Sequence, residues 1–347
     1  MNILQRFSIQ KILNKNSRSY NIVVIALLAA MLVLGVFLSI SIGSSKISLH
    51  KIISAILKGD STSKTYQIIF FVRIPRMLAA ILAGCALSVS GVILQSVLNN
   101  SLASPNIIGV NAGAGLFTVF ITALFPSYLY FAPIAAFTGA LIAVFLVYFI
   151  AQKTGASRIT IVLSGVAVSS FIGAITDTVL TLWPDTAISR TTFLIGGFSG
   201  VTMENIRFSA WFIIAAFVIV LILSYDMNVL SLGDETAKSL GLNVSVYRFV
   251  FLITAALLAG SAISFAGLLG FIGLIVPHAA RFLIGHDNRL LIPVCALLGG
   301  VFTLFCDLMA RVLFAPFEIP VGIIMSFLGG PFFIYLLLKQ KRGRIYD

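Results

Sequence analysis

Apolar segments long enough to cross a lipid bilayer recur along almost the whole chain. A helix needs about 20 apolar residues to span the hydrocarbon core of a membrane. Nine segments meet this length, and a tenth apolar stretch, 270–285, is interrupted by Pro277 and His278 and predicts a short or irregular crossing. Lipid offers no hydrogen bonds to free backbone groups, so the pattern predicts an all-α, polytopic membrane protein with about ten transmembrane helices. The other nine predicted spans are 20–42, 75–98, 105–125, 130–151, 159–182, 208–225, 248–269, 290–313 and 319–338.

Composition supports the same class of protein. Of 347 residues, 59% are hydrophobic and 10% are charged, whereas soluble domains carry about a quarter charged residues. The net charge of +12 would suggest nucleic acid in a soluble protein, but cytoplasmic lysines and arginines explain it in a membrane protein, so no nucleic-acid partner is expected. Segment 20–42 is longer than the apolar part of a secretory signal and predicts a retained first span.

Basic residues indicate the orientation of the spans. They gather in the tail at 339–344, in the turns at 153–158 and 281–289, and at Arg248, all on the side of the N-terminus. The positive-inside rule predicts that both termini are cytoplasmic. The predicted external loop 43–76 breaks this rule with six basic residues, and its apolar residues at helical spacing suggest an interfacial helix. The loop is either a docking surface for an acidic partner or charge carried across during insertion.

An internal repeat links the two parts of the chain. Leu82–Gly91 in the second span resembles Leu258–Gly267 in the seventh. The Pro133 and Gly139 pair in the fourth span has the same spacing as Pro293 and Gly299 in the ninth. Spans five apart cross in opposite directions, so the repeat is predicted to be inverted, a common transporter design. Small residues also recur in any membrane bundle, which is the alternative reading. The predicted halves are 75–182 and 248–338.

Longer motifs carry a family resemblance, and they cover about residues 20 to 340. In order along the chain, the motifs are Arg73-Ile-Pro-Arg76 with Gly84, Gly91 and Gln95, then Asn100–Pro105 and Gly109, Leu232–Gly241, Ser264–Leu268, Pro277–Arg281, Gly285–Arg289 and Glu318–Gly322. They resemble the permease family of iron-siderophore, haem and vitamin B12 ABC importers. One departure is Ser101, where the family has proline.

The resemblance implies a single permease domain, 1–347, in a bacterial cytoplasmic membrane. Two ATPase subunits, an external substrate-binding protein and a second permease copy, identical or related, are the implied partners. The chain has no phosphate-binding Gly-x-x-x-x-Gly-Lys-Ser/Thr motif, so it is not expected to be an enzyme. The expected cargo is an iron-siderophore-type chelate. Haem or cobalamin is the alternative within the family, and an ion-coupled secondary transporter is the alternative from another class.

Three arginines are predicted to dock the binding protein. By resemblance, Arg73, Arg76 and Arg311 occupy the positions that meet glutamates on its two lobes. Arginine suits this role because its planar fork binds carboxylates bidentately. Snorkelling to the membrane interface is the alternative for each. Within the ninth span, Asp307 is four residues before Arg311, which predicts an ion pair on one helix face.

The polar segment 226–247 is predicted to couple the chain to the ATPase. Acidic residues begin a short helical pattern that a glycine ends, and the alternative is a solvated loop helix. The coupling residues named on this basis are Gly233, Asp234, Glu235, Ala237, Ser239, Leu240 and Gly241.

Two turns resemble the inner gate of the family. Asn100, Leu102 and Ser157 are the residues concerned, and ordinary turns are the alternative. His278 has no second ligand at suitable spacing, and the three cysteines match no metal motif. No resident metal or cofactor is therefore expected.

Overall fold

The structure is a computed structural model that describes residues 18–43, 62–155 and 157–343. Within these ranges, seven helical stretches are long and apolar enough to cross a membrane, and three further apolar helices are shorter. This confirms the predicted all-α, polytopic fold. The membrane helices are α2 (Arg18–Ser41), α5 (Ile74–Val97), α6 (Val110–Leu124), α7 (Ala132–Lys153), α8 (Arg158–Leu182), α10 (Met203–Ile222), α13 (Val244–Ala266), α14 (Ile272–Ile284), α15 (Asn288–Val312) and α16 (Val321–Gly343).

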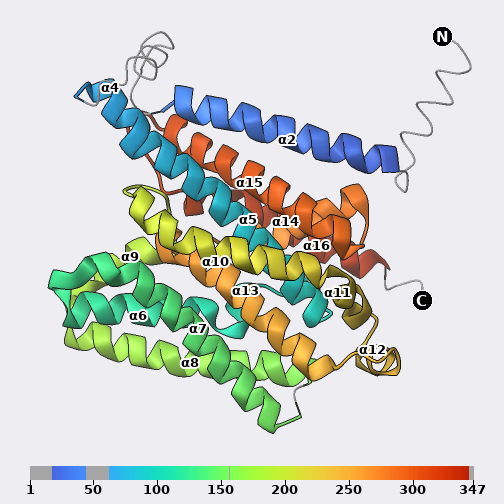
Figure 1. The fold of residues 1–347 in the computed structure, drawn as a ribbon. Coiled ribbons are helices and arrows are strands. Elements are labelled where there is room, and N and C mark those ends of the chain that lie inside the picture. The colour runs from blue at the N-terminus through green and yellow to red at the C-terminus, as the bar shows by residue number, and fades with distance from the viewer. Residues whose placement is uncertain (1–17, 44–61, 156, 344–347) are drawn as a thin grey trace, which may run out of the picture.

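Short elements mark the two ends of the bundle (Figure 1). One end, called the α9 end below, carries α4 (Lys64–Gln67) and α9 (Ala187–Ile195). The other, called the α12 end, carries α11 (Ser224–Ser231) and α12 (Asp234–Ser239). The start of α2 and the end of α16 both lie at the α12 end, so the first and last described helices begin and finish on the same side.

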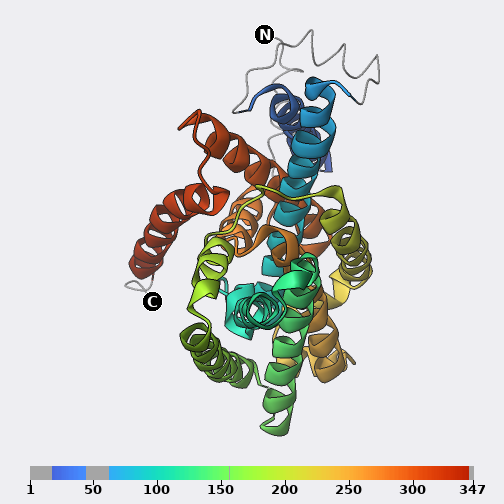
Figure 2. The same ribbon diagram turned by 90° about the vertical axis from the view of Figure 1, so that its left-hand side faces the viewer.

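Burial separates central helices from peripheral ones. In the most apolar window of α5 and of α13, 78% of the residues are buried, against 22% in α2 and 33% in α8. Viewed along the bundle, α2, α8 and α16 lie at its periphery (Figure 2). The apolar side chains that these outer helices expose suit contact with lipid or another membrane subunit.

Glycines let the central helices approach closely. A Cβ atom on Gly84 of α5 would lie 2.1 Å from the carbonyl oxygen of Gly299 on α15. In the other half, Gly260 of α13 packs against Ala140 of α7, next to Gly139. The sequence repeat matches Gly84 with Gly260 and Gly299 with Gly139. Gly139 itself packs against Gly113 of α6, so both halves place glycines of the repeat at helix crossings, but with different partners.

The second membrane helix begins well before its predicted start at residue 75. Pro75 has no N–H, so a helix that continues upstream of it loses one backbone hydrogen bond. In the structure, α4 and a π-helical turn (Ile68–Arg73) precede α5 without a break. The Ile74 N–H bonds to the Ile69 carbonyl, five residues back, and this wider turn admits the proline.

Other local predictions also differ from the structure. Helix α14 continues through Pro277, and the chain breaks earlier, where Gly267 and Phe271 have positive φ values of 68° and 67°. Helix α9 has nine residues, too few to be recognised as a membrane span. The interfacial helix suggested within 43–76 falls largely on residues outside the described part of the chain.

Candidate functional site

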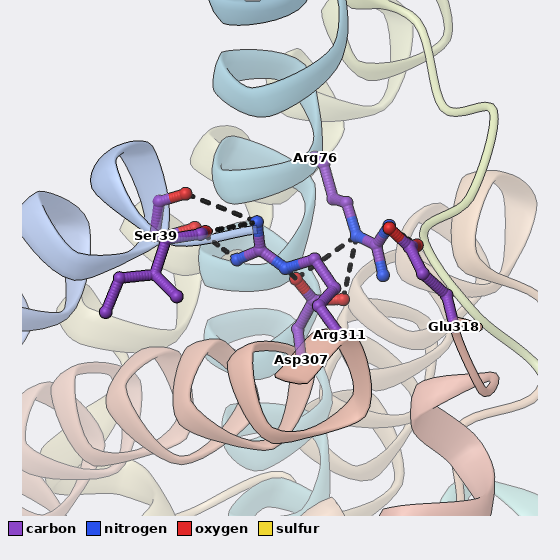
Figure 3. A network of polar contacts seen from close by, with 6 residues as sticks. Ser39, Arg76, Asp307, Arg311 and Glu318 are labelled. Atoms are coloured by element: carbon purple, nitrogen blue, oxygen red, sulfur yellow. Dashed lines mark hydrogen bonds and ion pairs between the residues drawn. The ribbon is translucent and has the colours of Figure 1, made fainter. Parts of the chain in front are cut away.

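A buried ionic cluster joins α5, α15 and the segment before α16 at the α9 end (Figure 3). Arg76 lies in the first turn of α5, where its Nε donates to both carboxylate oxygens of Asp307, at 2.9 and 3.2 Å. Its Nη1 donates to Glu318. One guanidinium therefore bridges a carboxylate on α15 and a carboxylate in the loop that leads into α16.

A second guanidinium extends the cluster to α2. Arg311 Nε lies 3.1 Å from Asp307 Oδ2, which confirms the predicted pair within α15. Arg311 Nη2 donates to the Ser39 hydroxyl at 2.7 Å and its Nη1 donates to the Ser39 carbonyl at 3.2 Å. Arg73 binds the same helix end, since its Nη1 donates to the carbonyls of Ile40 and Ser41. Arginine side chains thus hold the free carbonyls at the end of α2.

Burial makes this cluster energetically demanding. Asp307 is fully buried, and Arg76 and Arg311 are 7% and 2% exposed. The two arginines, Asp307 and Glu318 have a formal charge sum of zero. Ions in so dry a place persist only when they are paired and hydrogen-bonded. Removing one partner would leave an uncompensated charge, so the four groups act as a unit.

A cavity of about 640 Å³ opens beside the cluster. Arg76 and Glu318 line it together with residues from α6, α9, α13 and the start of α16. Its wall includes an irregular strip where the Gly197 N–H bonds to the Ala266 carbonyl at 2.8 Å. Among the cluster residues, Glu318 keeps its side chain 30% exposed and is the one open to solvent.

The three predicted docking arginines lie together, but they face inward. Arg73 is 3% exposed, and like Arg76 and Arg311 it binds groups of this chain. Their assignment to the binding protein stays a prediction. Sequence reasoning missed Ser39 as a partner of Arg311 and Glu318 as a partner of Arg76. The signal available was a lone carboxylate at the edge of an apolar segment.

At the α12 end, two arginines hold one carboxylate. Both oxygens of Asp234, the first residue of α12, lie 2.7 Å from Arg248 Nη2 on α13. Arg158 Nη2, at the start of α8, lies 3.1 Å from Asp234 Oδ1. Arg158 Nη2 also donates to the Leu230 carbonyl in α11. The carboxylate therefore links α12 to the N-terminal ends of α8 and α13.

Electrostatics keep Asp234 ionised. Burial alone would raise the pKa of this carboxyl, but the hydrogen bond from Arg248 and the charges of Arg248, Arg158 and Lys238 outweigh burial and lower the pKa below its ordinary value. The tie between α12 and the membrane helices is thus intact at neutral pH. The sequence had marked Arg248 and Arg158 only as basic residues on the cytoplasmic side.

Helix α12 is the short helix that the sequence predicted, and its coupling to an ATPase stays a prediction. Gly233 precedes it with a φ of +114°, and Gly241 follows it with a φ of +86°, both values that favour glycine. Ala237 is fully buried and anchors the inner face. Leu232 and Leu240 are 62% and 63% exposed. The outer face therefore combines two apolar side chains with exposed Glu235, Lys238 and Ser239.

The predicted gate residues occupy turns. Asn100 is exposed, and its Oδ1 accepts from the Leu102 N–H at 2.9 Å. Ser157 caps α8, where its hydroxyl accepts from the Thr160 N–H at 3.1 Å. Asn100 lines a second cavity at the α12 end, whereas Leu102 and Ser157 do not line it. Their gating role stays a prediction.

No cluster of three or more His, Cys, Asp or Glu side chains that could hold a metal ion occurs in the described ranges. Asp177, a further carboxylate near a membrane helix end, is 67% exposed at its side chain and pairs with Arg190 at 3.2 Å. It is therefore a surface pair, and the ionic chemistry of the bundle concentrates in the cluster and in the Asp234 tie.

Comparison with known proteins identifies the family. The sequence profile of the FecCD transport family matches residues 25–339. The Fe(3+)-citrate import system permease protein YfmE of Bacillus subtilis is 37% identical over 319 residues, covering 92% of this chain and 95% of the relative. The iron(3+)-hydroxamate permease FhuB of Bacillus subtilis is 37% identical over 94% of this chain and 86% of its own. The hemin permease HmuU of Yersinia pestis is 35% identical over 79% and 84%.

A solved structure agrees with these sequence matches. A metal-chelate type ABC transporter in an inward-facing conformation superposes with a TM-score of 0.81 at 28% identity, covering 91% of this chain and 98% of the other. The match fits an ATP-driven importer and not the ion-coupled transporter that the inverted repeat alone would permit. The chain belongs to the FecCD transport family and is a multi-pass permease of ABC importer type.

Proposed function

We propose that this permease moves a ferric chelate of siderophore type into the cytoplasm. Two relatives at 37% identity carry names of Fe(3+)-citrate and iron(3+)-hydroxamate import, and the first spans nearly the whole chain. That full-length similarity is the observation that carries the proposal. Haem is the second candidate, because a hemin permease is 35% identical over 79% of the chain.

The α12 end is proposed to face the cytoplasm and to bind two ATPase subunits through two permease copies. The exposed face of α12, with Leu232 and Leu240, supplies an apolar contact of the kind that fits a groove on a soluble partner. The Asp234 tie supports this proposal, because movement of α12 would pass directly to α8 and α13. The membrane is proposed to be the bacterial cytoplasmic membrane, with both termini inside.

The α9 end is proposed to receive the external binding protein. Arg73, Arg76 and Arg311 are already bonded within the chain, so a carboxylate of the partner has to displace an internal one. Glu318 is the candidate for displacement, since its side chain is the exposed member of the cluster. Docking would then release the segment before α16 beside the cavity.

The proposal includes the two halves, 75–182 and 248–338, as the inverted repeat that rocks during transport. Asn100, Leu102 and Ser157 are proposed to close the cytoplasmic side between cycles. Support for Asn100 comes from its exposed position at a cavity of the α12 end.

The test is uptake into proteoliposomes that contain the permease, its ATPase and its binding protein. Radioactive ferric citrate, a ferric hydroxamate, haem and cobalamin are supplied in turn, with and without ATP inside. We expect ATP-dependent uptake of a ferric chelate and no uptake without the binding protein. Uptake of haem or cobalamin alone would contradict the siderophore proposal, and uptake without ATP would contradict the transport class.

A further inference from the structure

A cavity of about 570 Å³ lies at the α12 end, between the end of α5, the second half of α14 and the start of α15. Most of its lining residues are of polar type, among them an arginine, two histidines and several amides. Asn100 is the one lining residue that also belongs to the proposed inner gate. The lining residues are Gln95, Ser96, Asn99, Asn100, Ser101, Ser231, His278, Arg281, Phe282, His286 and Asn288.

Pro277 sets the geometry of this cavity. Proline has no N–H, so the carbonyl one turn earlier, on Gly273, loses its helical donor. The Gln95 side chain replaces that donor, since its Nε2 donates to the Gly273 carbonyl at 3.0 Å. Gln95 is 4% exposed, and this bond fixes the orientation of its amide. Its Oε1 then accepts from Arg281 Nη1.

Arg281 is thereby held at the cavity by a neutral partner. No Asp or Glu of ranges 18–43, 62–155 and 157–343 forms an ion pair with it. By contrast, the buried arginines Arg76 and Arg311 are neutralised by Asp307 and Glu318. A guanidinium stays charged at any physiological pH, and a partly desolvated charge gains most from a counter-ion. One guanidinium nitrogen on Gln95 leaves other N–H groups to serve an anion.

The neighbouring side chains suit the same ligand. His278 and His286 lie on the cavity wall with Arg281 and can donate ring N–H bonds. Asn99, Asn100 and Asn288 add amide donors, and no carboxylate is among the lining residues. Arginine with amide and imidazole donors is the arrangement that recognises carboxylate or phosphate oxygens.

We infer that the cavity between α5, α14 and α15 binds an oxyanion, a carboxylate or phosphate group, through Arg281. The inference goes beyond the proposed transport function and does not depend on which chelate is carried. A bound oxyanion would link the turn after α5 to α14 and to the start of α15. It would therefore restrain the α12 end against opening.

A purely structural role is the competing account of Arg281. The residue lies in the last turn of α14, where a positive charge suits the helix dipole. Under that account, replacing Arg281 changes stability but leaves anion binding unaltered. Arg289 provides a matched control because it lies at the same end, in the first turn of α15. Its guanidinium stacks on the Tyr225 ring at 4.6 Å, and it does not line the cavity.

The experiment titrates sodium citrate and inorganic phosphate into the purified full-length chain by calorimetry, comparing wild type, Arg281→Gln and Arg289→Gln. Native mass spectrometry in nanodiscs with and without phosphatidylglycerol tests whether a lipid phosphate is the source. We expect Arg281→Gln to weaken binding at least about tenfold and Arg289→Gln to leave it unchanged. His286→Asn, a change at an exposed position, should weaken binding about threefold even if Arg281→Gln folds poorly.

Loss of citrate or free phosphate binding in Arg281→Gln supports a soluble oxyanion as the ligand. Loss of retained phosphatidylglycerol, with no binding of the free anions, supports the same site filled by a lipid headgroup. Binding of these anions that is equal in wild type, Arg281→Gln and His286→Asn would overturn the inference. So would a wild-type chain that binds none of them.

Discussion

At the α9 end, Arg76, Asp307, Arg311 and Glu318 turn toward one another in a nearly dry cluster, whereas at the α12 end Asp234 meets two arginines at the edge of the membrane bundle. The first arrangement joins three parts of the chain through mutual neutralisation. The second fixes one short helix while leaving its apolar outer face exposed. Arginine–carboxylate pairs thus join segments of the bundle at the α9 end and hold one short helix in place at the α12 end.

The difference in burial predicts different consequences of mutation. Breaking the α9-end cluster leaves buried charges without compensation, whereas at the α12 end only the Arg248 side chain is buried, at 3% exposed, and the Asp234 side chain is 35% exposed to water. Changes at the α9 end should therefore unfold the protein. Changes at the α12 end should uncouple it while the fold survives.

The largest effect is expected from Asp307→Asn. It removes the carboxylate shared by Arg76 and Arg311 inside the bundle, at an expected cost of about 3–5 kcal/mol. We expect loss of monodisperse protein in size-exclusion chromatography or a large fall in Tm. Asp177→Asn, at a carboxylate with a 67% exposed side chain, is the control and should leave Tm unchanged. Equal Tm values for the two variants would show that the cluster does not stabilise the fold.

A smaller loss of stability is expected from Gly84→Ala. The added Cβ would lie 2.1 Å from the Gly299 carbonyl, so α5 and α15 must separate, at about 1–3 kcal/mol. Because Arg76 and Asp307 lie on these two helices, the cluster should loosen as well. Gly173→Ala on α8 is the control, since nothing lies within 4 Å of the added atom. Equal Tm values for Gly84→Ala and Gly173→Ala would show that the close contact between α5 and α15 does not stabilise the fold.

Asp234→Ala tests the α12 end. The Asp234 side chain is 35% exposed, but its removal leaves Arg248, 3% exposed, without a carboxylate, so we expect a cost of about 1–2 kcal/mol together with loss of permease-stimulated ATP hydrolysis. Glu235→Ala changes the next, exposed carboxylate and should retain stimulation. If the Asp234→Ala variant still stimulates ATP hydrolysis fully, the contacts of Asp234 with the two arginines are not needed for coupling.

The pKa of Asp234 predicts the pH range of this tie. A carboxyl whose folded pKa is lowered contributes stability above its unfolded value of about 3.9, and loses it as pH falls through the folded pKa. The Tm difference between wild type and Asp234→Asn should therefore stay constant from about pH 7 to 5 and shrink below about pH 4. A difference that disappears near pH 6 would contradict the lowered pKa.

The sequence predicted what depends on local pattern. Apolar length revealed the membrane helices, and acidic residues followed by Gly241 indicated α12. It did not reveal contacts between distant residues, such as Arg76 with Glu318, which are 242 positions apart. The second span was predicted to start at residue 75, whereas α4 and a π-helical turn extend the helix upstream of it. The three docking arginines were expected, from the family resemblance, to meet a partner protein, whereas in the structure Asp307, Glu318 and the end of α2 are their partners.

Site-specific photocrosslinking tests the assignment of the two ends most directly. A benzophenone amino acid replaces Leu240 on α12 in one variant and Phe317, 78% exposed beside Glu318, in another. In the assembled importer, the probe at 240 should crosslink to the ATPase and the probe at 317 to the binding protein. The account would be contradicted if each probe crosslinked to the other's expected partner. It would also be contradicted if the probe at 240 crosslinked to neither the ATPase nor the binding protein.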